Sequence, residues 1–240
     1  MNHMIRVKGL SKSFGKQRVL KDIELTVAEG QIYGLIGPSG SGKTTLVKMI
    51  VGIDSPDSGT VTVMDKRVPD LGLLQDIGYM AQSDALYPEL TGKENLAFFA
   101  SLFNLKGSRL EERIDYVAKI VDLETSLNKK VAAYSGGMKR RLSLAIALVH
   151  DPKLLILDEP TVGIDPELRQ SVWQELLELM AQGKTIVLTT HVMDEAAKCE
   201  MIALVRDGGI LASGSPEELK AKFGASDLEG VFLAAGRGAV

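Results

Sequence analysis

The sequence predicts one α/β domain, and three observations support this prediction. An apolar strand, residues 31–36, runs into a glycine-rich loop, and an amphipathic helix follows until Gly52. A second apolar strand, residues 153–157, ends in two carboxylates. Strand patterns dominate residues 4–36, whereas residues 84–139 have helical patterns. We expect a core with a β lobe (about 1–83 and 140–220), a helical lobe (about 84–139) and a short C-terminal extension (about 221–240).

Composition narrows the class of protein. With 45% hydrophobic and 25% charged residues the chain is typical of globular proteins, and its net charge of −3 argues against a dedicated nucleic-acid binder. No apolar run approaches the roughly 18 residues of a membrane-spanning helix, and the first residues lack the apolar core of a signal peptide. A single cysteine, Cys199, is typical of the reducing cytoplasm, and we expect it to pack in the core rather than to act as a nucleophile.

The glycine-rich loop has the pattern G-x-x-x-x-G-K-[ST], a phosphate-binding motif of nucleoside triphosphatases. It consists of Gly37, Pro38, Ser39, Gly40, Ser41, Gly42, Lys43 and Thr44. Glycines allow a tight turn whose N–H groups converge on phosphate oxygens, and Lys43 reaches the β- and γ-phosphates. The Thr44 hydroxyl is a ligand for Mg²⁺, and the following helix aims its positive end at the same anion. An accidental glycine- and serine-rich turn is the alternative, and the flanking strand and helix disfavour it.

The β-rich segments contain two polar or aromatic candidates. Alternating apolar residues predict strands around Ile5 and Ile23, and Phe14 lies in the turn between them. An aromatic ring there is compatible with stacking on a nucleotide base, although such rings are more often core residues. After a loop at 54–59, strands are expected at 60–63 and 77–81, the second ending at Gln82. Gln82 either projects into a site or simply ends the strand.

Two capping-box patterns predict helices in the inserted lobe. Thr91 is followed by Glu94, and Ser108 by Glu111, each before an apolar helical pattern. The basic residues of this lobe alternate with acids, which indicates a solvated helix face rather than a nucleic-acid patch. The lobe ends in Tyr134-Ser135-Gly136-Gly137-Met138, a turn before a helix at 139–148 and a second possible anion site.

The apolar strand at 153–157 ends in Asp158 and Glu159. In phosphate-loop proteins an acid at such a strand end holds Mg²⁺, and the neighbouring carboxylate is able to polarise the attacking water. A solvated Asp-Glu turn is the alternative. Asp165 then caps a helix that begins with Pro166, and a strand at 185–190 ends at His191, which gains interest if this strand lies beside Asp158. A strand pair near 202–211 and a final helix from Ser215 complete the chain.

The order of these motifs resembles the ATP-binding subunit of an ABC transporter, over about residues 4–220. The resemblance implies that Phe14 stacks on adenine, that the loop with Thr45 holds the triphosphate, and that Gln82 senses Mg²⁺ and couples to a membrane domain. It implies Thr44, Gln82 and Asp158 at Mg²⁺, Glu159 as general base and His191 as the γ-phosphate switch. It further makes Ser135, Gly136, Gly137 and Met138 a signature motif that acts across a dimer, with Asp165 in communication between the subunits.

The sequence departs from the family pattern at two positions. Tyr134 stands where the family commonly has Leu, and Met138 where Gln is frequent, but the phosphate-facing Ser-Gly-Gly is intact. The segments 90–96, 135–141 and 227–232 resemble the branch that exports drugs, antibiotics, lipids or polysaccharides.

The resemblance implies an ATPase, with ATP and Mg²⁺ as ligands, that energises a separate transmembrane permease at the cytoplasmic face of the membrane. Two copies, or a copy and a homologue, would face head to tail, and no nucleic-acid partner is expected. One alternative is an ABC-type ATPase of DNA repair or translation, but such proteins usually carry long coiled-coil insertions or two cassettes. Another is a non-hydrolysing regulatory module, which would be expected to lose Lys43, Glu159 or His191.

Overall fold

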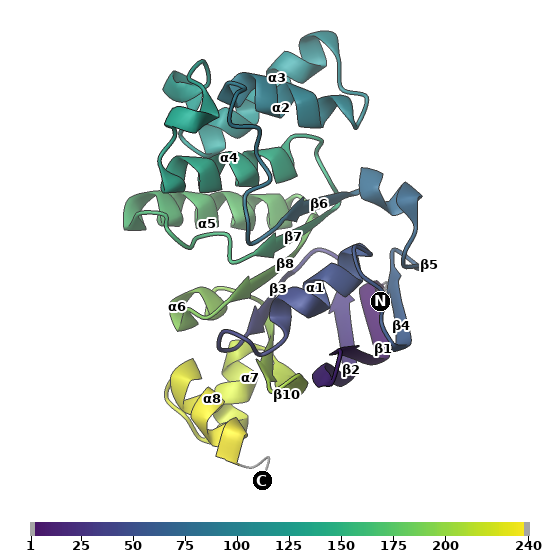
Figure 1. Ribbon diagram of the computed structural model, residues 1–240. Coiled ribbons are helices and arrows are strands. Elements are labelled where there is room, and N and C mark those ends of the chain that lie inside the picture. The colour runs from purple at the N-terminus through teal and green to yellow at the C-terminus, as the bar shows by residue number, and fades with distance from the viewer. Residues whose placement is uncertain (1–2, 238–240) are drawn as a thin grey trace.

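The computed structural model describes residues 3–237, and two β-sheets organise it (Figure 1). The first sheet is antiparallel, with the order β2-β1-β4-β5. Its strands are β1 (His3–Phe14), β2 (Gln17–Ala28), β4 (Ser58–Val63) and β5 (Lys66–Arg67). One face of this sheet packs on the core and the other is exposed, which explains why apolar and polar residues alternate along its strands.

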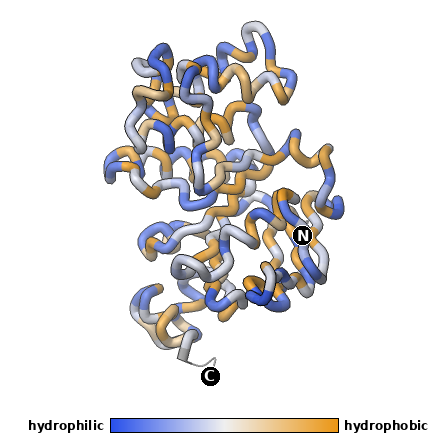
Figure 2. Tube along the Cα trace, viewed as in Figure 1, coloured by the Kyte–Doolittle hydropathy of each residue, from blue (hydrophilic) through white to orange (hydrophobic). Residues whose placement is uncertain are grey.

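The second sheet has six strands in the order β10-β9-β3-β8-β7-β6. The parallel strands are β3 (Ile32–Ile36), β6 (Ile77–Met80), β7 (Leu154–Asp158), β8 (Thr185–Thr190) and β9 (Met201–Arg206), and β10 (Gly209–Gly214) is antiparallel to β9. Every residue of β3, β7 and β8 is buried, which explains why their sequences are continuous rather than alternating apolar runs (Figure 2).

Helices cover both faces of the six-stranded sheet. Helix α1 (Lys43–Val51) lies between the two sheets and buries Leu46, Val47 and Ile50 in a core that they share (Figure 1). Helices α4 (Gly136–Leu148) and α5 (Pro166–Ala181) contribute to a second core, on the other side. The loop between β3 and α1 therefore connects a central strand to a helix that is packed in the core.

The helical lobe contains α2 (Gly92–Ser101) and α3 (Gly107–Ile120), packed on α4. Short 3₁₀ turns occur at Leu71–Gln75, Glu124–Ser126 and Val131–Ala133. The capping box of Thr91 and Glu94 is confirmed, with both reciprocal hydrogen bonds formed. The box expected at Ser108 is wrong: α3 begins earlier, at Gly107, and has no side-chain cap, so Ser108 already lies inside the first turn.

The C-terminal region is more extensive than the sequence predicted. Helix α7 (Pro216–Phe223) begins with the expected cap at Ser215, but it is not the final helix, because α8 (Leu228–Arg237) follows it. Helix α8 packs on α7, β10 and the short helix α6 (Met193–Ala196), so it is part of the folded unit. Residues 1–2 and 238–240 of the expected domain lie outside the described residues.

The cysteine and the helices also bear on the expectations from composition. Cys199 is buried against Gly34, and burial raises the pKa of its thiol, as suits a packing residue. Within residues 3–237 no helix combines the length and the apolar character that a membrane span requires.

Candidate active site

The carboxyl ends of adjacent parallel strands bring the candidate residues together. Strand β8 lies between β3 and β7, with Thr190 opposite Ile36 and Thr189 opposite Asp158. The phosphate loop follows β3, Glu159 follows β7 and His191 follows β8, so all three leave the same edge of the sheet. His191 therefore meets the condition that made it interesting in the sequence.

Backbone geometry explains the glycines of the loop. A Cβ atom on Gly37 would lie 2.1 Å from the carbonyl oxygen of Val205. Gly42 has φ +106°, and a Cβ there would lie 2.9 Å from Cδ2 of Leu20. Side chains are excluded at both positions, so the loop passes close to β9 and β2 while Pro38, Ser39 and Gly40 remain exposed.

Lys43 is buried within its own loop. Its Nζ donates hydrogen bonds to the carbonyl oxygens of Gly37 at 2.7 Å and Pro38 at 3.0 Å. Burial lowers the pKa of Lys43, while the charges of Glu159 and Asp158 act in the opposite direction. The ammonium group is thus fixed beside the loop and within electrostatic reach of both carboxylates.

Thr44 and Gln82 border the same space. A hollow of about 260 Å³ is lined by Thr44 and Lys48 of α1 and by Tyr79, Ala81, Gln82 and Ser83. The first turn of α1 carries no acidic residue, and Thr44 and Thr45 are half-buried there. This end of the helix is suited to an anion.

Asp158 is completely buried, and its two carboxylate oxygens differ. Oδ1 accepts a hydrogen bond from the hydroxyl of Thr189, whereas Oδ2 is buried without a hydrogen-bond partner among the described residues. A buried carboxylate oxygen of this kind suits a cation. In residues 3–237 no three His, Cys, Asp or Glu side chains gather as a metal cluster.

Glu159 has an uncommon backbone conformation. Its φ is +52°, in the left-handed region that residues with side chains rarely adopt. The conformation is held because the Glu159 N–H group lies 3.2 Å from the carbonyl oxygen of Thr189 and 2.9 Å from its hydroxyl. Oε1 of Glu159 lies 3.3 Å from Nδ1 of His191. Strain of this kind, held by surrounding bonds, is typical of functional sites.

Arg140 connects the site to α4, and no sequence pattern singled it out. Its buried guanidinium donates to the carbonyl oxygens of Ala81 at 2.7 Å, Gln82 at 3.1 Å and Glu159 at 2.8 Å, and to that of Asp158. The strand ends that carry Gln82 and Glu159 are therefore joined through one side chain. In the sequence Arg140 is only the middle of three consecutive basic residues.

Phe14 is not a core residue. It ends β1 in a hairpin with β2, and its side chain is 52% exposed. The start of β2 borders the phosphate loop, because a Cβ atom on Gly42 would contact Val19 and Leu20 of that strand. The ring therefore stands free on a hairpin beside the loop, and Nζ of Lys12 lies 5.3 Å from its centroid.

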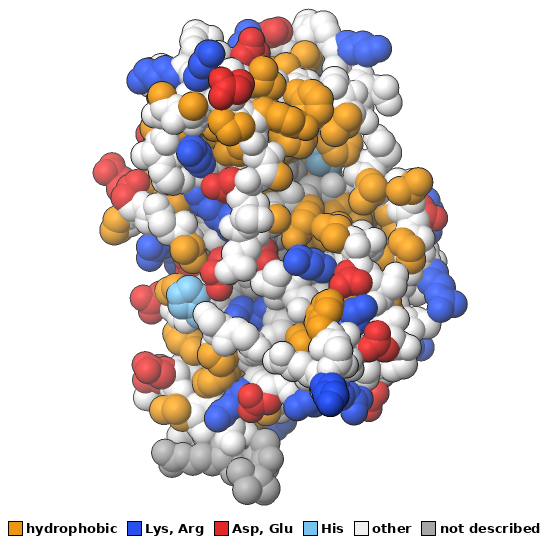
Figure 3. All heavy atoms as spheres, in the orientation of Figure 1, with side chains coloured by type: hydrophobic (Ala, Val, Ile, Leu, Met, Phe, Trp, Pro, Cys, Tyr) orange, Lys and Arg blue, Asp and Glu red, His pale blue; other side chains and the backbone are white. Residues whose placement is uncertain are grey.

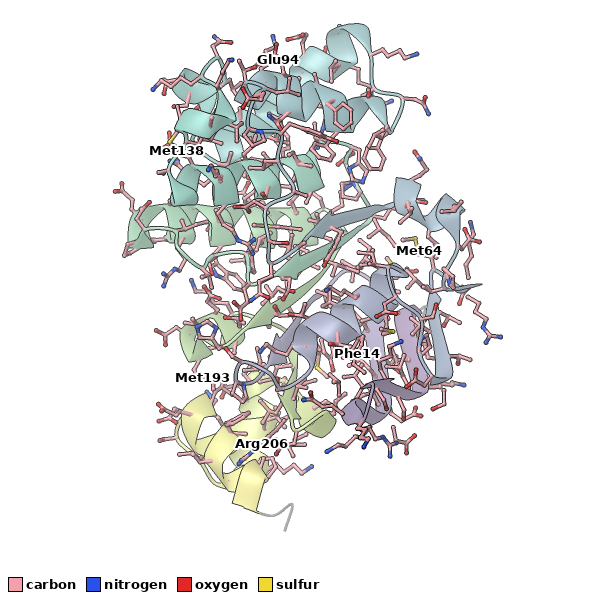
Figure 4. All side chains as sticks on the ribbon, viewed as in Figure 1. Phe14, Met64, Glu94, Met138, Met193 and Arg206 are labelled. Atoms are coloured by element: carbon pink, nitrogen blue, oxygen red, sulfur yellow. The ribbon has the colours of Figure 1, made fainter. Side chains whose placement is uncertain are left out.

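The Ser-Gly-Gly turn lies at the N-terminus of α4, beside the loop that follows Glu159. Ser135 caps α4 by accepting a hydrogen bond from the N–H group of Met138 at 3.2 Å, and Ser135 and Gly136 are exposed. A Cβ on Gly137 would lie 3.2 Å from the carbonyl oxygen of Gly163. Figure 4 shows Met138 and Phe14 well apart on the molecule, so the chain does not bring its own turn to its own hairpin.

Tyr134 and Asp165 occupy structural positions beside that turn. The buried Tyr134 hydroxyl donates to the carbonyl oxygen of Ser126 at 2.8 Å, which anchors the turn in the helical lobe. Asp165 is exposed and caps α5 as expected, accepting from the N–H group of Leu168 at 3.0 Å.

Comparisons with known proteins agree with this geometry. The family described as ABC transporter matches residues 20–162. The Nod factor export ATP-binding protein I of Bradyrhizobium diazoefficiens is 41% identical over 221 residues, covering 91% of this chain and 72% of that protein. Its counterpart from Rhizobium johnstonii is 43% identical over 218 residues, covering 90% and 70%.

Solved structures show the same similarity. An ATP binding subunit of an ABC transporter matches with a TM-score of 0.90 and 29% identity, covering 97% of this chain and 99% of that one. A dimeric ATP-binding cassette in a post-hydrolysis state, bound to ADP and Pi, matches with a TM-score of 0.82 and 30% identity, covering 88% and 98%.

These matches confirm the expected fold, an ABC ATPase with an antiparallel β lobe and a helical part. They also confirm the predicted class of enzyme, an ATPase that belongs to a membrane transporter. The chain belongs to the ABC transporter family, as the ATP-binding subunit of such a transporter.

Proposed function

We propose that this subunit hydrolyses Mg-ATP to drive export through a separate membrane-spanning permease. The observation that carries the proposal is the similarity, over about nine-tenths of the chain, to proteins named for Nod factor export. The export segments noted in the sequence point the same way. The subunit then works at the cytoplasmic face of the membrane, where ATP is available, and the permease supplies the span.

Each residue at the sheet edge and on the neighbouring hairpin has a separate role in ATP binding or hydrolysis. Phe14 stacks on adenine, and the loop from Gly37 to Thr45, with Lys43, holds the triphosphate. Thr44, Gln82 and Asp158 would hold Mg²⁺, which neutralises charge on the β- and γ-phosphate oxygens. Glu159 orients the attacking water and accepts its proton, and His191 holds Glu159 and contacts the γ-phosphate. Support comes from the convergence of these residues and from the unpartnered oxygen of Asp158.

A dimer completes each site. Ser135 and Gly136 are exposed, and Figure 4 shows Met138 of the same turn well apart from Phe14, so a second subunit would bring this turn to the nucleotide. In a head-to-tail pair the N-termini of α1 and α4 would contact one ATP from opposite sides. Asp165, exposed at the start of α5, then lies where it communicates with the partner subunit.

The permease has a suitable docking surface beside Gln82. A groove of about 370 Å³ runs between the core and the helical lobe, and its walls are largely apolar (Figure 3). It includes Ile53, Leu74, Phe99, Leu102 and Phe103. It shares Tyr79, Ala81 and Ser83 with the hollow that Gln82 and Thr44 line. A short apolar segment of the permease in this groove would lie next to Gln82, which Arg140 joins to Glu159.

Reconstitution tests the function and the docking surface together. The permease that co-purifies with the tagged chain is identified, and the pair is reconstituted in vesicles. We expect ATP hydrolysis that rises with permease and stops with Glu159→Gln. Leu102→Asp introduces a charge at a residue that is 57% exposed in the groove, and should abolish permease binding while the isolated chain still hydrolyses ATP. Leu233→Asp, on α8 and 55% exposed, is the matched control. Equal permease binding by both variants would exclude the groove.

A further inference from the structure

Glu195 is a buried carboxylate that joins two separate loops of the site. It lies on α6, and the residue is only 3% exposed. Oε1 accepts a hydrogen bond from the hydroxyl of Thr161, in the loop between β7 and α5. Oε2 accepts one from the hydroxyl of Thr190, the last residue of β8, at 2.7 Å. One side chain thus bridges the exits of two adjacent strands.

Both loops carry residues that the proposed function uses. Thr161 stands between Glu159 and Asp165 in the chain. On the other side, Thr190 directly precedes His191, and its hydroxyl accepts a hydrogen bond from the N–H group of Val192 at 3.0 Å. The Thr190 hydroxyl thus bonds to Glu195 and to the N–H group of Val192, and it holds the residues on both sides of His191.

A cation strengthens the connection on the side of the Asp165 loop. Arg169 of α5 donates to the carbonyl oxygen of Ile164 at 3.3 Å, and its Nε lies 3.9 Å from Oε1 of Glu195. This is a loose ion pair, so most of the interaction of the buried carboxylate comes from the two hydroxyl groups. Burial of a carboxylate is unfavourable unless its oxygens are well satisfied, which makes the geometry of this network stringent.

We propose that Glu195 is a positioning residue that ties the Asp165 loop to the His191 turn and so sets the position of His191 relative to Glu159. The inference rests on the proposed roles of His191, Glu159 and Asp165. When the partner subunit displaces the Asp165 loop, Thr161 moves with it, and the bond through Glu195 passes the displacement to Thr190. Formation of the dimer is thereby coupled to the arrangement of the catalytic pair.

Thr161→Val cuts this connection at one end with little change of shape. Loss of one such hydrogen bond corresponds to roughly a fivefold to tenfold fall in kcat for ATP hydrolysis, with KM for ATP little changed. Thr161→Ser keeps the hydroxyl and should restore turnover. Thr62→Val is the matched control, because the Thr62 hydroxyl makes a long 3.5 Å bond to Arg6 in the other sheet, far from these loops in the chain. Melting curves of all variants show whether a fall in kcat merely follows lost stability.

A double-mutant cycle separates positioning from other effects. If Thr161 and Glu195 act through His191, then Thr161→Val and Glu195→Gln lower turnover in the wild type but have no additional effect on the residual turnover of His191→Ala. Equal effects in both backgrounds, or wild-type kcat in Thr161→Val, would overturn the inference. If Glu159→Gln and His191→Ala themselves leave hydrolysis unchanged, the proposed function has failed instead.

Discussion

Nδ1 of His191 lies 3.3 Å from Oε1 of Glu159, across the ends of two adjacent parallel strands. The contact fixes one oxygen of the carboxylate. The backbone of Glu159 adds to this orientation, because its left-handed φ is held by two contacts to Thr189. The contact with His191 and the backbone conformation together set the orientation of the Glu159 carboxylate.

Lys43→Ala should weaken ATP binding and abolish turnover. The ammonium already lies beside the loop carbonyls, so it needs little rearrangement to meet the β- and γ-phosphates. Loss of a charge-assisted contact weakens binding at least about tenfold. Calorimetric titration measures the affinity, with Lys66→Ala on the exposed strand β5 as the control. Near-normal hydrolysis by the purified Lys43→Ala protein would contradict the assignment of the loop.

Phe14→Ala should weaken ATP binding by about 1–3 kcal/mol, as for other contacts between bases and aromatic rings. The melting temperature should change little, because the ring is 52% exposed on a hairpin. Phe14→Trp should preserve affinity. Tripolyphosphate, which has no base, should bind equally to the wild type and to Phe14→Ala. If both ligands lose affinity equally, the ring acts on the phosphate loop rather than on adenine.

The sequence predicted those features that depend on local pattern. The cap at Asp165 and the capping box at Thr91 are set by residues three positions apart, and the ends of β7 and β8 by apolar runs. The prediction of a capping box at Ser108 was wrong because the helix starts at Gly107. Ser108 is therefore inside the helix and is not the capping residue. Local spacing is sufficient only where the chain enters the helix at the expected residue.

Features that depend on tertiary contacts could not be predicted. Arg140 is buried because that face of α4 meets the ends of β6 and β7, and nothing distinguishes it from its basic neighbours in the sequence. Glu195 is similarly hidden in an ordinary polar helix. Helix α8 contains Gly236, a poor helix residue, and it packs on α7, α6 and β10. These tertiary contacts are not visible in the local sequence pattern.

Gly92→Ala should destabilise the helical lobe through Tyr134. A Cβ on Gly92 would lie 2.2 Å from the Tyr134 hydroxyl, which is held by Ser126. Overpacking of this kind costs about 1–3 kcal/mol of unfolding free energy. The substitution should be better tolerated in a Tyr134→Leu background, where the hydroxyl is gone. Chemical denaturation of the four proteins measures the coupling, and additive losses would show that the two positions do not interact.

Ser135→Arg should prevent the ATP-dependent dimer without preventing ATP binding. The turn is exposed and distant from the hairpin of its own chain, so a bulky cation there obstructs only a partner subunit. Sedimentation with and without ATP follows the dimer, while calorimetry follows binding to the monomer. Ser108→Arg, at an exposed position in the first turn of α3, controls for added charge. A normal ATP-dependent dimer of Ser135→Arg would remove the turn from the interface.

Glu159→Gln should separate binding from hydrolysis. Glutamine keeps the shape of the side chain and the same backbone constraint at φ +52°, so the strand end and its bonds to Thr189 should persist. The amide cannot accept a proton as the carboxylate does, so turnover should fall by about 10²–10⁴-fold, the usual effect of a positioned general base. Affinity for Mg-ATP should remain near that of the wild type, because the loop and Asp158 are unchanged.

Persistence of ATP gives Glu159→Gln a second signature. A dimer that closes around ATP and opens after hydrolysis should accumulate in this variant, and size-exclusion chromatography with Mg-ATP detects it. Asp158→Asn should differ, because it removes charge at the buried oxygen that suits Mg²⁺, so Mg²⁺-dependent binding is lost as well. Glu178→Gln, exposed on α5, should behave as the wild type in both measurements. Wild-type turnover in Glu159→Gln would exclude Glu159 as the base, and a slow variant that stays monomeric would keep the base but exclude the dimer as the hydrolysing unit.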